Sequence, residues 1–558
     1  MSQHRRRVSA TQARRRRVAA TAAGAAAVVA LTGVGLGLWA DGGGQSGGGE
    51  PAGSAARTPA ERPAERAPAA PEHRQTPSPG RSHPLSSAPR TIPAVRAHTP
   101  ARGPGWRPER GHRVVVSDAD LADEGRLIAG ELGMAYGGQK ADLRAGDVRL
   151  ALNDDEGADP ESYTMTVRGG RVTITAPDDA GVFYGTRTLK QAVRGGGSAP
   201  EGVVRDDPAK PRRGFMLDIA RKHFDAAWIE DRVRELGDLK FNELGLHFSD
   251  DQGFRIASDT HPEVVSEDHL TKAQVRRIVK LAESRHITVV PEIDSPGHLG
   301  AVIAAHPGLQ LRNAQGVAAA GAVDISNPDA AEIVDDLLNE YAELFPGTPW
   351  HLGGDEYRAL TAADPEASYP RLAAAARRAY GEGGTVADLA TGWLNDRAET
   401  VRVRGKSAPR AWNDGFYRNT SVGADERIQV AYWTGKEIGA RPPAEYLSAG
   451  RQVINYNDEF LYYVLGQPQT FVYPTGQRIY EQWTPRVLRG TQAVPARYDG
   501  LILGGVFAVW CDLAGSQTQE QVAAGIRMPL RATVQKLWNP GEPSLSWSEF
   551  RALADRLE

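Results

Sequence analysis

His351-Leu352-Gly353-Gly354-Asp355-Glu356 closes an apolar, strand-like run with two adjacent carboxylates. Hydrolysis of a glycoside needs a carboxylic acid to protonate the leaving oxygen and a negative group to stabilise the positive charge at the anomeric carbon. Adjacent carboxylates in one pocket repel, which tends to keep one of them protonated near neutral pH. A regular strand would point the two acids to opposite faces, so their joint use requires an irregular strand end, which the two glycines permit.

Around this segment, from Pro211 onward, the chain alternates short apolar runs with amphipathic segments such as Trp228 to Leu239 and Lys272 to Ser284. This repetition favours a parallel sheet, and eight such units close into a barrel. The strand candidates are Gly214 to Ala220, Glu243 to Phe248, Ile287 to Ile293, Trp350 to Gly354, Ala408 to Asn413, Ile428 to Trp433, Gln452 to Tyr456 and Gly500 to Trp510. We therefore expect an α/β protein in which residues 209–558 form a (β/α)8 TIM barrel.

The active site of such a barrel lies at the C-terminal ends of its strands, where this chain carries many polar and aromatic residues. These are Arg221, Asp250, Asp294, His298, Asp355, Glu356, Trp412, Trp433, Tyr462 and Trp510. Each alone has an ordinary explanation: a tryptophan is more often a core residue, and Arg221 with Asp218 or Asp250 could form a structural ion pair. Their shared position at one rim predicts a single site.

Three further segments accompany the first motif: residues 213–221 (RGFMLDIAR), 246–254 (LHFSDDQGF) and 292–298 (EIDSPGH). Together they resemble the family 20 glycoside hydrolases, the β-N-acetylhexosaminidases, whose signature is His-x-Gly-Gly-Asp-Glu. The resemblance runs from about residue 112 to the C-terminus. It implies retaining hydrolysis of β-linked N-acetylhexosamine, GlcNAc or GalNAc, from a glycan. The nucleophile would be the substrate's own acetamido oxygen, which closes an oxazolinium ring.

The same resemblance implies a role for each site residue. Glu356 would be the proton donor, and Asp355 would orient the acetamido N–H and stabilise its developing charge. Asp250 and His298 would form a relay to Glu356, Asp294 would hold Asp355, and His351 opens the signature as a supporting residue. Arg221 would bind the sugar's 3- and 4-hydroxyl groups. Trp412, Trp433 and Trp510 would line the pocket, and Tyr462, with Tyr463 as its rival, would donate to the acetamido oxygen.

Two departures from the family pattern leave the substrate open. Tyr462-Tyr463-Val464 lacks the acid that many relatives carry after the seventh strand, and Asp512 stands where many have a glutamate that contacts the 4- and 6-hydroxyls. Both resemble the dispersin-like and lacto-N-biosidase-like branch, so a disaccharide-releasing or polymer-directed enzyme is an alternative. A retaining glycosidase with two catalytic carboxylates and a sugar-binding wall protein without turnover are further alternatives.

Before the barrel, residues 112–208 read as a small α+β accessory domain, because short strand candidates precede an amphipathic segment at Ala180 to Ala192. The strand candidates are Val114 to Val116, Val148 to Leu152, Tyr163 to Val167 and Arg171 to Thr175. Residues 41–111 are rich in Gly, Pro and Ala, which predicts a disordered linker. Residues 1–40 place arginines before an uncharged apolar stretch, as in an export signal or a membrane anchor.

The composition is that of an ordinary globular protein with 558 residues and a net charge of -3, which gives no argument for a nucleic-acid partner. Cys511 is the single cysteine, so an intrachain disulfide is excluded. No cofactor or metal is implied, because the carboxylates are in no ligand-spaced cluster with His or Cys. The N-terminal segment predicts an extracellular protein, secreted or held at the outer face of the membrane, with no other membrane contact.

Overall fold

A computed structural model describes residues 83–558, apart from 140, 156 and 437–439. The expected export segment and residues 41–82 of the expected linker therefore lie outside the described residues. Within the described part, no helix is both long and apolar enough to cross a membrane.

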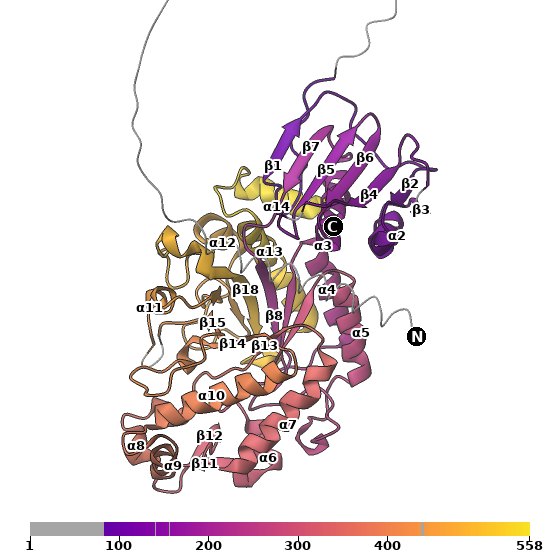
Figure 1. The fold of residues 1–558 in the computed structure, drawn as a ribbon. Helices are drawn as coiled ribbons and strands as arrows, with labels where there is room; N and C mark the ends of the chain where they lie inside the picture. Colours follow the sequence, from indigo (N-terminus) through magenta and orange to yellow (C-terminus); the bar gives the residue numbers. More distant parts are fainter. Residues whose placement is uncertain (1–82, 140, 156, 437–439) are drawn as a thin grey trace, which may run out of the picture. The chain divides into compact units, whose positions relative to one another are not determined.

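The accessory domain is a seven-stranded sheet with two helices packed on it (Figure 1). Its strands are β1 (Ala97–Pro100), β2 (Arg113–Val116), β3 (Ala135–Gln139), β4 (Val148–Leu152), β5 (Tyr163–Arg168), β6 (Arg171–Ala176) and β7 (Gly202–Asp206), and its helices are α2 (Ala122–Glu131) and α3 (Asp179–Gly196). The strand order is β1-β7-β5-β6-β4-β2-β3. Gly169 and Gly170 join β5 to β6 with φ of 59° and 69°, as a tight hairpin requires.

The accessory domain begins earlier than the sequence indicates. β1 pairs with β7 along its whole length, although it lies in the segment expected to be a disordered linker. Ile92 is fully buried, and its backbone exchanges hydrogen bonds with the side chain of Gln191 in α3. The partners of this segment are about 100 residues away in the sequence, and its composition carries no sign of them. β7 and the first barrel strand lie on either side of the expected boundary at residue 208.

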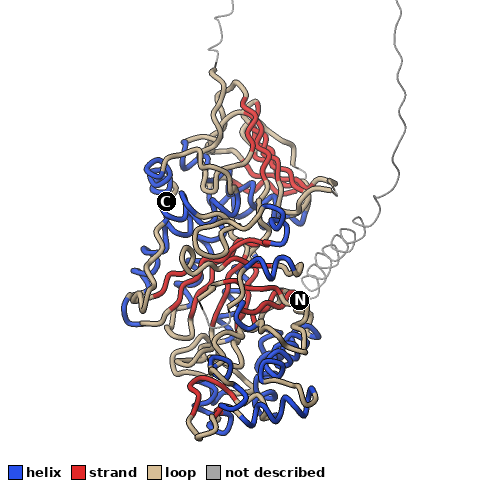
Figure 2. Tube along the Cα trace, turned by 90° about the vertical axis from the view of Figure 1, so that its left-hand side faces the viewer, coloured by secondary structure: helices blue, strands red, loops and turns tan. Residues whose placement is uncertain are grey.

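The catalytic-domain candidate is a closed barrel of eight parallel strands, separate from the accessory sheet (Figure 2). Its strands are β8 (Arg212–Asp218), β9 (Glu243–His247), β10 (Thr288–Glu292), β13 (Pro349–His351), β14 (Ala408–Trp412), β15 (Gln429–Tyr432), β16 (Val453–Asn455) and β18 (Ile502–Trp510). All eight strand candidates are confirmed, and the pairing of β16 with β18 closes the ring. The sequence missed β17 (Tyr462–Val464), which pairs with the end of β18, and the hairpin of β11 (Gln310–Arg312) and β12 (Ala318–Val323).

Helices follow every barrel strand except β14, whose connection to β15 has only the 3-10 turn η5 (Asn413–Gly415). They are α4 (Ala226–Asp238), α5 (Lys272–Glu283), α6 (Gly300–Ala305), α7 (Pro328–Leu344), α8 (Pro365–Ser368), α9 (Pro370–Tyr380), α10 (Val386–Val403), α11 (Pro443–Ser448), α12 (Gly476–Gln482), α13 (Gln519–Trp538) and α14 (Trp547–Arg556). Some of these helices start at a capping box: Thr271 and Gln274 form one at α5, and Thr385 and Asp388 form another at α10.

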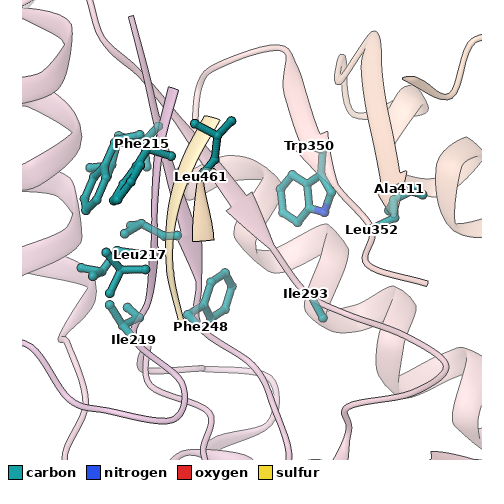
Figure 3. Packing of buried hydrophobic residues seen from close by; sticks show 14 of the residues in the cluster. Phe215, Leu217, Ile219, Phe248, Ile293, Trp350, Leu352, Ala411 and Leu461 are labelled. Carbon is teal, nitrogen blue, oxygen red and sulfur yellow. The ribbon is translucent and has the colours of Figure 1, made fainter. Parts of the chain in front are cut away.

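Alternating side chains of the barrel strands build two cores. Phe215 and Leu217 of β8 point outward into the layer between strands and helices, which Figure 3 shows with Phe248 and Leu461. Met216, between them, points inward and joins an interior cluster that includes Trp412, Tyr462 and Trp510. This two-residue period is the expected pattern for a barrel strand. Aromatic side chains therefore fill the barrel interior close to the strand ends that carry the acids.

Candidate active site

The Asp355-Glu356 pair lies just beyond β13, where the backbone leaves strand geometry. Gly353 and Gly354 have φ of 66° and 98°, and Glu356 has φ of 48°. A Cβ on Gly353 would lie 1.7 Å from Oδ1 of Asp294, so this position admits only glycine. The expected irregular strand end is confirmed, and it frees the two acids from the alternation of a strand.

Asp355 is the enclosed member of the pair, with a side chain that is 15% exposed. Its carboxyl group lies beside that of Asp294, with an oxygen of each within 4.8 Å of the other, and two buried carboxyl groups this close favour one proton between them. Asp294 also accepts a 2.7 Å hydrogen bond from the backbone N–H of Gly354. Burial, and then repulsion by Asp294, raise the pKa of Asp355 well above its usual value, and burial raises the pKa of Asp294. The two carboxyl groups therefore share a proton at neutral pH.

His298 lies between acids that come from different strand ends. Its Nδ1 is 3.4 Å from Oδ1 of Asp250, and its Nε2 is 3.6 Å from Oδ2 of Asp355 and 3.7 Å from Oε2 of Glu356. Burial lowers the pKa of His298, but the carboxylates of Asp355 and Asp250 outweigh burial and raise the pKa to about 10. The ring is thus an imidazolium at neutral pH, and it connects Asp250 to the acid pair.

Glu356 reaches toward solvent, with a side chain that is 41% exposed against 15% for Asp355. Its backbone N–H donates a 2.9 Å hydrogen bond to Oδ2 of Asp414. The other oxygen of Asp414 accepts a 2.9 Å hydrogen bond from the indole N–H of Trp433. Asp414 therefore joins the backbone of the acid pair to the aromatic wall. Sequence reasoning missed this residue, although it directly follows the predicted fifth strand.

Arg221 is held in place by two carboxylates. Its Nη1 is 3.0 Å from Oδ2 of Asp218, and its Nη2 is 2.8 Å from Oδ2 of Asp250. The guanidinium carbon lies 5.4 Å from the centre of the Trp510 ring. Burial lowers the pKa of Arg221, while the charges of Asp218, Asp250 and Asp512 raise it by more. The side chain keeps 13% of its surface exposed, so its remaining N–H groups can bind a ligand.

The aromatic candidates gather in one cluster beside the acids. Trp433 stacks on Tyr462 with ring centres 5.8 Å apart and planes 5° apart, and Trp510 lies 5.8 Å from Tyr462. Trp412 is in the same cluster but is only 1% exposed, and its indole N–H donates to Oε1 of Glu292 at 2.8 Å. In this structure Trp412 therefore offers no open face to a sugar, whereas Trp433 is partly exposed. This difference arises because the inward side of β14 is filled by core packing.

Of the two rival tyrosines, Tyr462 is the one in the site. Burial and the nearby charge of Asp355 raise the pKa of Tyr462 well above its usual value. Tyr463 points away: it stacks on Tyr473 at 4.2 Å and hydrogen bonds to Gln517. The alternation along β17 separates the two neighbours and places Tyr462 in the interior cluster.

A buried trio supports the site from one rung of the barrel. Glu292 is in register with His247 on one side and His351 on the other. Its oxygens lie 3.2 Å from Nδ1 of each histidine. Burial lowers the pKa of His247, but Glu292 and Asp250 raise it by more, so this ring carries a positive charge. His247 and Glu292 lie within the quoted motifs, yet sequence reasoning gave them no role.

Three groups of described residues bring ligand atoms close enough to hold one metal ion: Asp250, Asp251 and His298; Asp294, His298 and Asp355; and His261, Glu263 and His306. The first two groups belong to the site, where His298 is already paired with carboxylates on both ring nitrogens. The third lies outside it. The sequence shows no ligand spacing for any of them, because each draws on separate connections of the barrel.

Two family models match this chain, one over the barrel and one over the accessory domain. The model of glycosyl hydrolase family 20, catalytic domain, matches residues 211–534, and that of family 20, domain 2, matches residues 88–207. The chain is 29% identical over 479 residues to a lacto-N-biosidase of Bifidobacterium bifidum, which covers 84% of this chain and 41% of the relative. It is 32% identical over 276 residues to a beta-N-acetylhexosaminidase of Cellulomonas fimi, which covers 44% of this chain and 54% of the relative. The chain thus spans only about half the length of these curated relatives.

Solved structures show the same fold over most of the chain. A family 20 beta-N-acetylhexosaminidase from Streptomyces coelicolor superposes with a TM-score of 0.67 at 24% identity, covering 85% of this chain and 96% of that one. A mutant beta-hexosaminidase of Streptomyces plicatus, in complex with its product GlcNAc, gives 0.65 at 25% identity and covers 86% and 95% of the two chains. The accessory domain and the barrel are both included in these matches.

Proposed function

We infer the activity from one premise: the chain belongs to glycosyl hydrolase family 20. We propose that it is a β-N-acetylhexosaminidase that removes β-linked N-acetylhexosamine units from glycans. Both the reaction and its substrate are part of this proposal, because the chain spans only part of the length of its curated relatives.

One observation carries the proposal: two adjacent acids of a single motif have different surroundings. Glu356 is 41% exposed at the open side, where a proton donor must meet the glycosidic oxygen. Asp355 is enclosed, shares a proton with Asp294 and faces His298. This division of roles suits one acid that protonates the leaving group and another that orients a polar group of the substrate.

The proposed reaction proceeds in two steps. As Glu356 gives its proton to the leaving oxygen, the acetamido oxygen of the substrate attacks the anomeric carbon, and Asp355 accepts a hydrogen bond from the acetamido N–H. Tyr462 donates its hydroxyl to the acetamido oxygen, which fixes that oxygen for attack. Glu356 then removes a proton from water, which opens the oxazolinium ring and releases the sugar with its configuration retained.

Binding of the sugar falls to the groups around this centre. Arg221 presents its free N–H groups to hydroxyls on the ring, with Asp218 and Asp250 holding the guanidinium. Trp433 and Trp510 supply the apolar contact that the C–H face of a pyranose favours. The imidazolium of His298, held by Asp250, places a positive charge 3.7 Å from Glu356, which can stabilise that carboxylate after it has given up its proton.

A second candidate is release of a disaccharide. The lacto-N-biosidase relative covers 84% of this chain, whereas the Cellulomonas fimi hexosaminidase covers 44%. Asp512 also has one methylene less than the glutamate found in many relatives, so its contact with the 4- and 6-hydroxyls of the sugar would differ from theirs. Comparing kcat/KM on 4-nitrophenyl N-acetyl-β-glucosaminide with that on 4-nitrophenyl β-lacto-N-bioside separates the two. A strong preference for the lacto-N-bioside would favour disaccharide release.

The decisive experiment is hydrolysis of an aryl N-acetyl-β-hexosaminide in the presence of a thiazoline that mimics the oxazolinium ion. Turnover with potent inhibition supports the proposal. Turnover without inhibition favours a glycosidase that uses two carboxylates, whose acids would be about 5 Å apart. No turnover on any N-acetylhexosaminide, together with sugar binding, favours a wall protein without catalysis.

We also propose that the protein acts outside the cytoplasm. The support is the order of residues at the N-terminus, where arginines precede an uncharged apolar stretch. Detection of the mature protein in the medium or on the cell surface tests this, and retention in the cytoplasm would contradict it.

A further inference from the structure

We propose that His261, Glu263 and His306 bind a divalent transition-metal ion, with Zn²⁺ the best fit to the donors, at a site separate from the active site. Asp336 supports this site by holding His261. The inference does not depend on the proposed activity.

The three donors already meet at one point. Oε1 of Glu263 is 3.0 Å from Nδ1 of His261 and 2.8 Å from Nε2 of His306. All the ligand atoms lie within 4.8 Å of one another. Zinc binds nitrogen and oxygen at about 2.0–2.1 Å with tetrahedral geometry, so ligand atoms in such a site are about 3.3 Å apart. The observed spacings need only a small outward shift of the side chains to admit the ion.

The surroundings of His261 match those of a metal-binding histidine. Its Nε2, on the side of the ring away from Glu263, is 3.3 Å from Oδ2 of Asp336 in α7. A histidine that binds a metal through one ring nitrogen almost always donates its other N–H to a carboxylate or carbonyl, which sets the tautomer and orients the ring. Two imidazoles and one carboxylate form a donor set that suits zinc and leaves a fourth position for water.

The backbone presents these side chains rigidly. His261 caps the 3-10 turn η2 (Pro262–Val264), and His306 lies between α6 and the 3-10 turn η3 (Pro307–Leu309). Each histidine is followed by a proline, which restricts its backbone. A hollow of about 560 Å³ lined by His261, His306 and Asp336 gives an ion access from solvent.

Salt bridges alone do not account for this convergence. The side chains of Glu263, His306 and Asp336 are 42%, 30% and 50% exposed, and exposed ion pairs contribute little to stability. Chelation of an ion would stabilise this arrangement more than exposed ion pairs do. His261 lies in the β9–α5 connection with Asp250, and His306 lies at the opposite end of α6 from His298. The ion would therefore tie together the two connections that carry Asp250 and His298.

The test uses the untagged full-length chain, stripped with a chelator and titrated with Zn²⁺ by isothermal calorimetry, with bound metal counted by mass spectrometry. We expect one Zn²⁺ per chain, a rise in Tm on binding, and loss of both in His261→Ala and His306→Ala. Asp336→Asn should weaken binding by about 10-fold to 100-fold. The matched control is His269→Ala, a histidine of the same connection outside the cluster, which should bind Zn²⁺ as the parent does.

A third variant and a second metal ion test the same site. Glu263→Gln preserves shape at an exposed position and serves if a histidine variant fails to fold; it should bind Zn²⁺ more weakly. Co²⁺ in place of Zn²⁺ should give the visible spectrum of tetrahedral coordination in the parent and not in His306→Ala. The proposal is overturned if the parent takes up no Zn²⁺, or if it takes up Zn²⁺ that the His261, Glu263 and His306 variants retain undiminished.

Discussion

Replacing Asp355 with asparagine keeps the shape of the side chain but removes its charge from an enclosed position. Loss of one preorganised electrostatic contact typically costs about 2.7–4 kcal/mol of barrier. Asp355 already shares a proton with Asp294 and faces the His298 imidazolium, so part of its charge is compensated in the free enzyme. We therefore expect about 2 kcal/mol or more, which is at least about 30-fold in kcat/KM on N-acetyl substrates.

The assay is initial-rate kinetics on 4-nitrophenyl N-acetyl-β-glucosaminide, with Asp231→Asn, an exposed acid of α4 outside the site, as the matched control. Asp355 raises the pKa of His298 more than any other charge, so the variant should also lower that pKa from about 10, which NMR titration of the ring measures. Azide should not rescue the variant. A covalent fluorosugar adduct located on Asp355 by mass spectrometry would refute the assigned role.

Four further predictions follow from the same geometry. Glu356→Gln should lower turnover of poor leaving groups by about 100-fold or more but affect acidic aryl leaving groups less, and equal losses across leaving groups would remove Glu356 as the proton donor. Gly353→Ala should cost about 100-fold in kcat/KM through displacement of the acid pair, whereas Gly354→Ala, whose Cβ would make only an ordinary 3.8 Å contact with Cα of Gly415, should cost less. The pKa of His298 rises on folding from 6.5 to about 10, so its contribution to the free energy of unfolding is complete below about pH 6.5 and is lost as pH rises through 10. In a pH series of urea unfolding curves, His298→Gln should therefore lose less stability over this range than the parent. A chain of residues 101–558 should be less stable than one of residues 83–558 by about 2 kcal/mol or more, because it lacks β1 and the buried Ile92; equal midpoints in urea would show that β1 contributes nothing.

The barrel was predictable because its strands are short apolar runs that alternate with amphipathic helices. All eight candidates overlap the observed strands, since burial on both faces leaves a clear mark on composition. The strands that were missed lack this mark. β3 (Ala135–Gln139) contains two glycines, β1 ends in proline, and β17 is three residues long and pairs only with the end of β18. Their pairing depends on distant segments that local pattern does not reveal.

The rim of the site was predictable for a related reason, since parallel strands bring their C-terminal ends together. Arg221, Asp250, His298 and the acid pair all lie where that rule puts them. What each residue touches was not predictable. Trp412 bonds to Glu292 in the core rather than offering an open face, and Asp414 holds the backbone of the acid pair from the next strand end.

The proposed zinc site was even less predictable from the sequence than the contacts of the active-site residues. His261 and Glu263 are two residues apart, but His306 comes from beyond α6 and Asp336 from the middle of α7. No spacing in the sequence joins these residues, and only the packing of two connections of the barrel, β9–β10 and β10–β13, brings His261, Glu263 and His306 within reach of one ion.

The central claim is that the substrate's acetamido oxygen is the nucleophile, with Asp355 serving it. The most direct test is the rate on a series of aryl glycosides whose acetamido group carries increasing numbers of fluorine atoms. Fluorine withdraws electrons from the carbonyl oxygen and weakens it as a nucleophile, so kcat/KM should fall steeply along the series. A rate that stays level as fluorine is added would show that the acetamido oxygen does not attack, and would contradict the mechanism proposed for this chain.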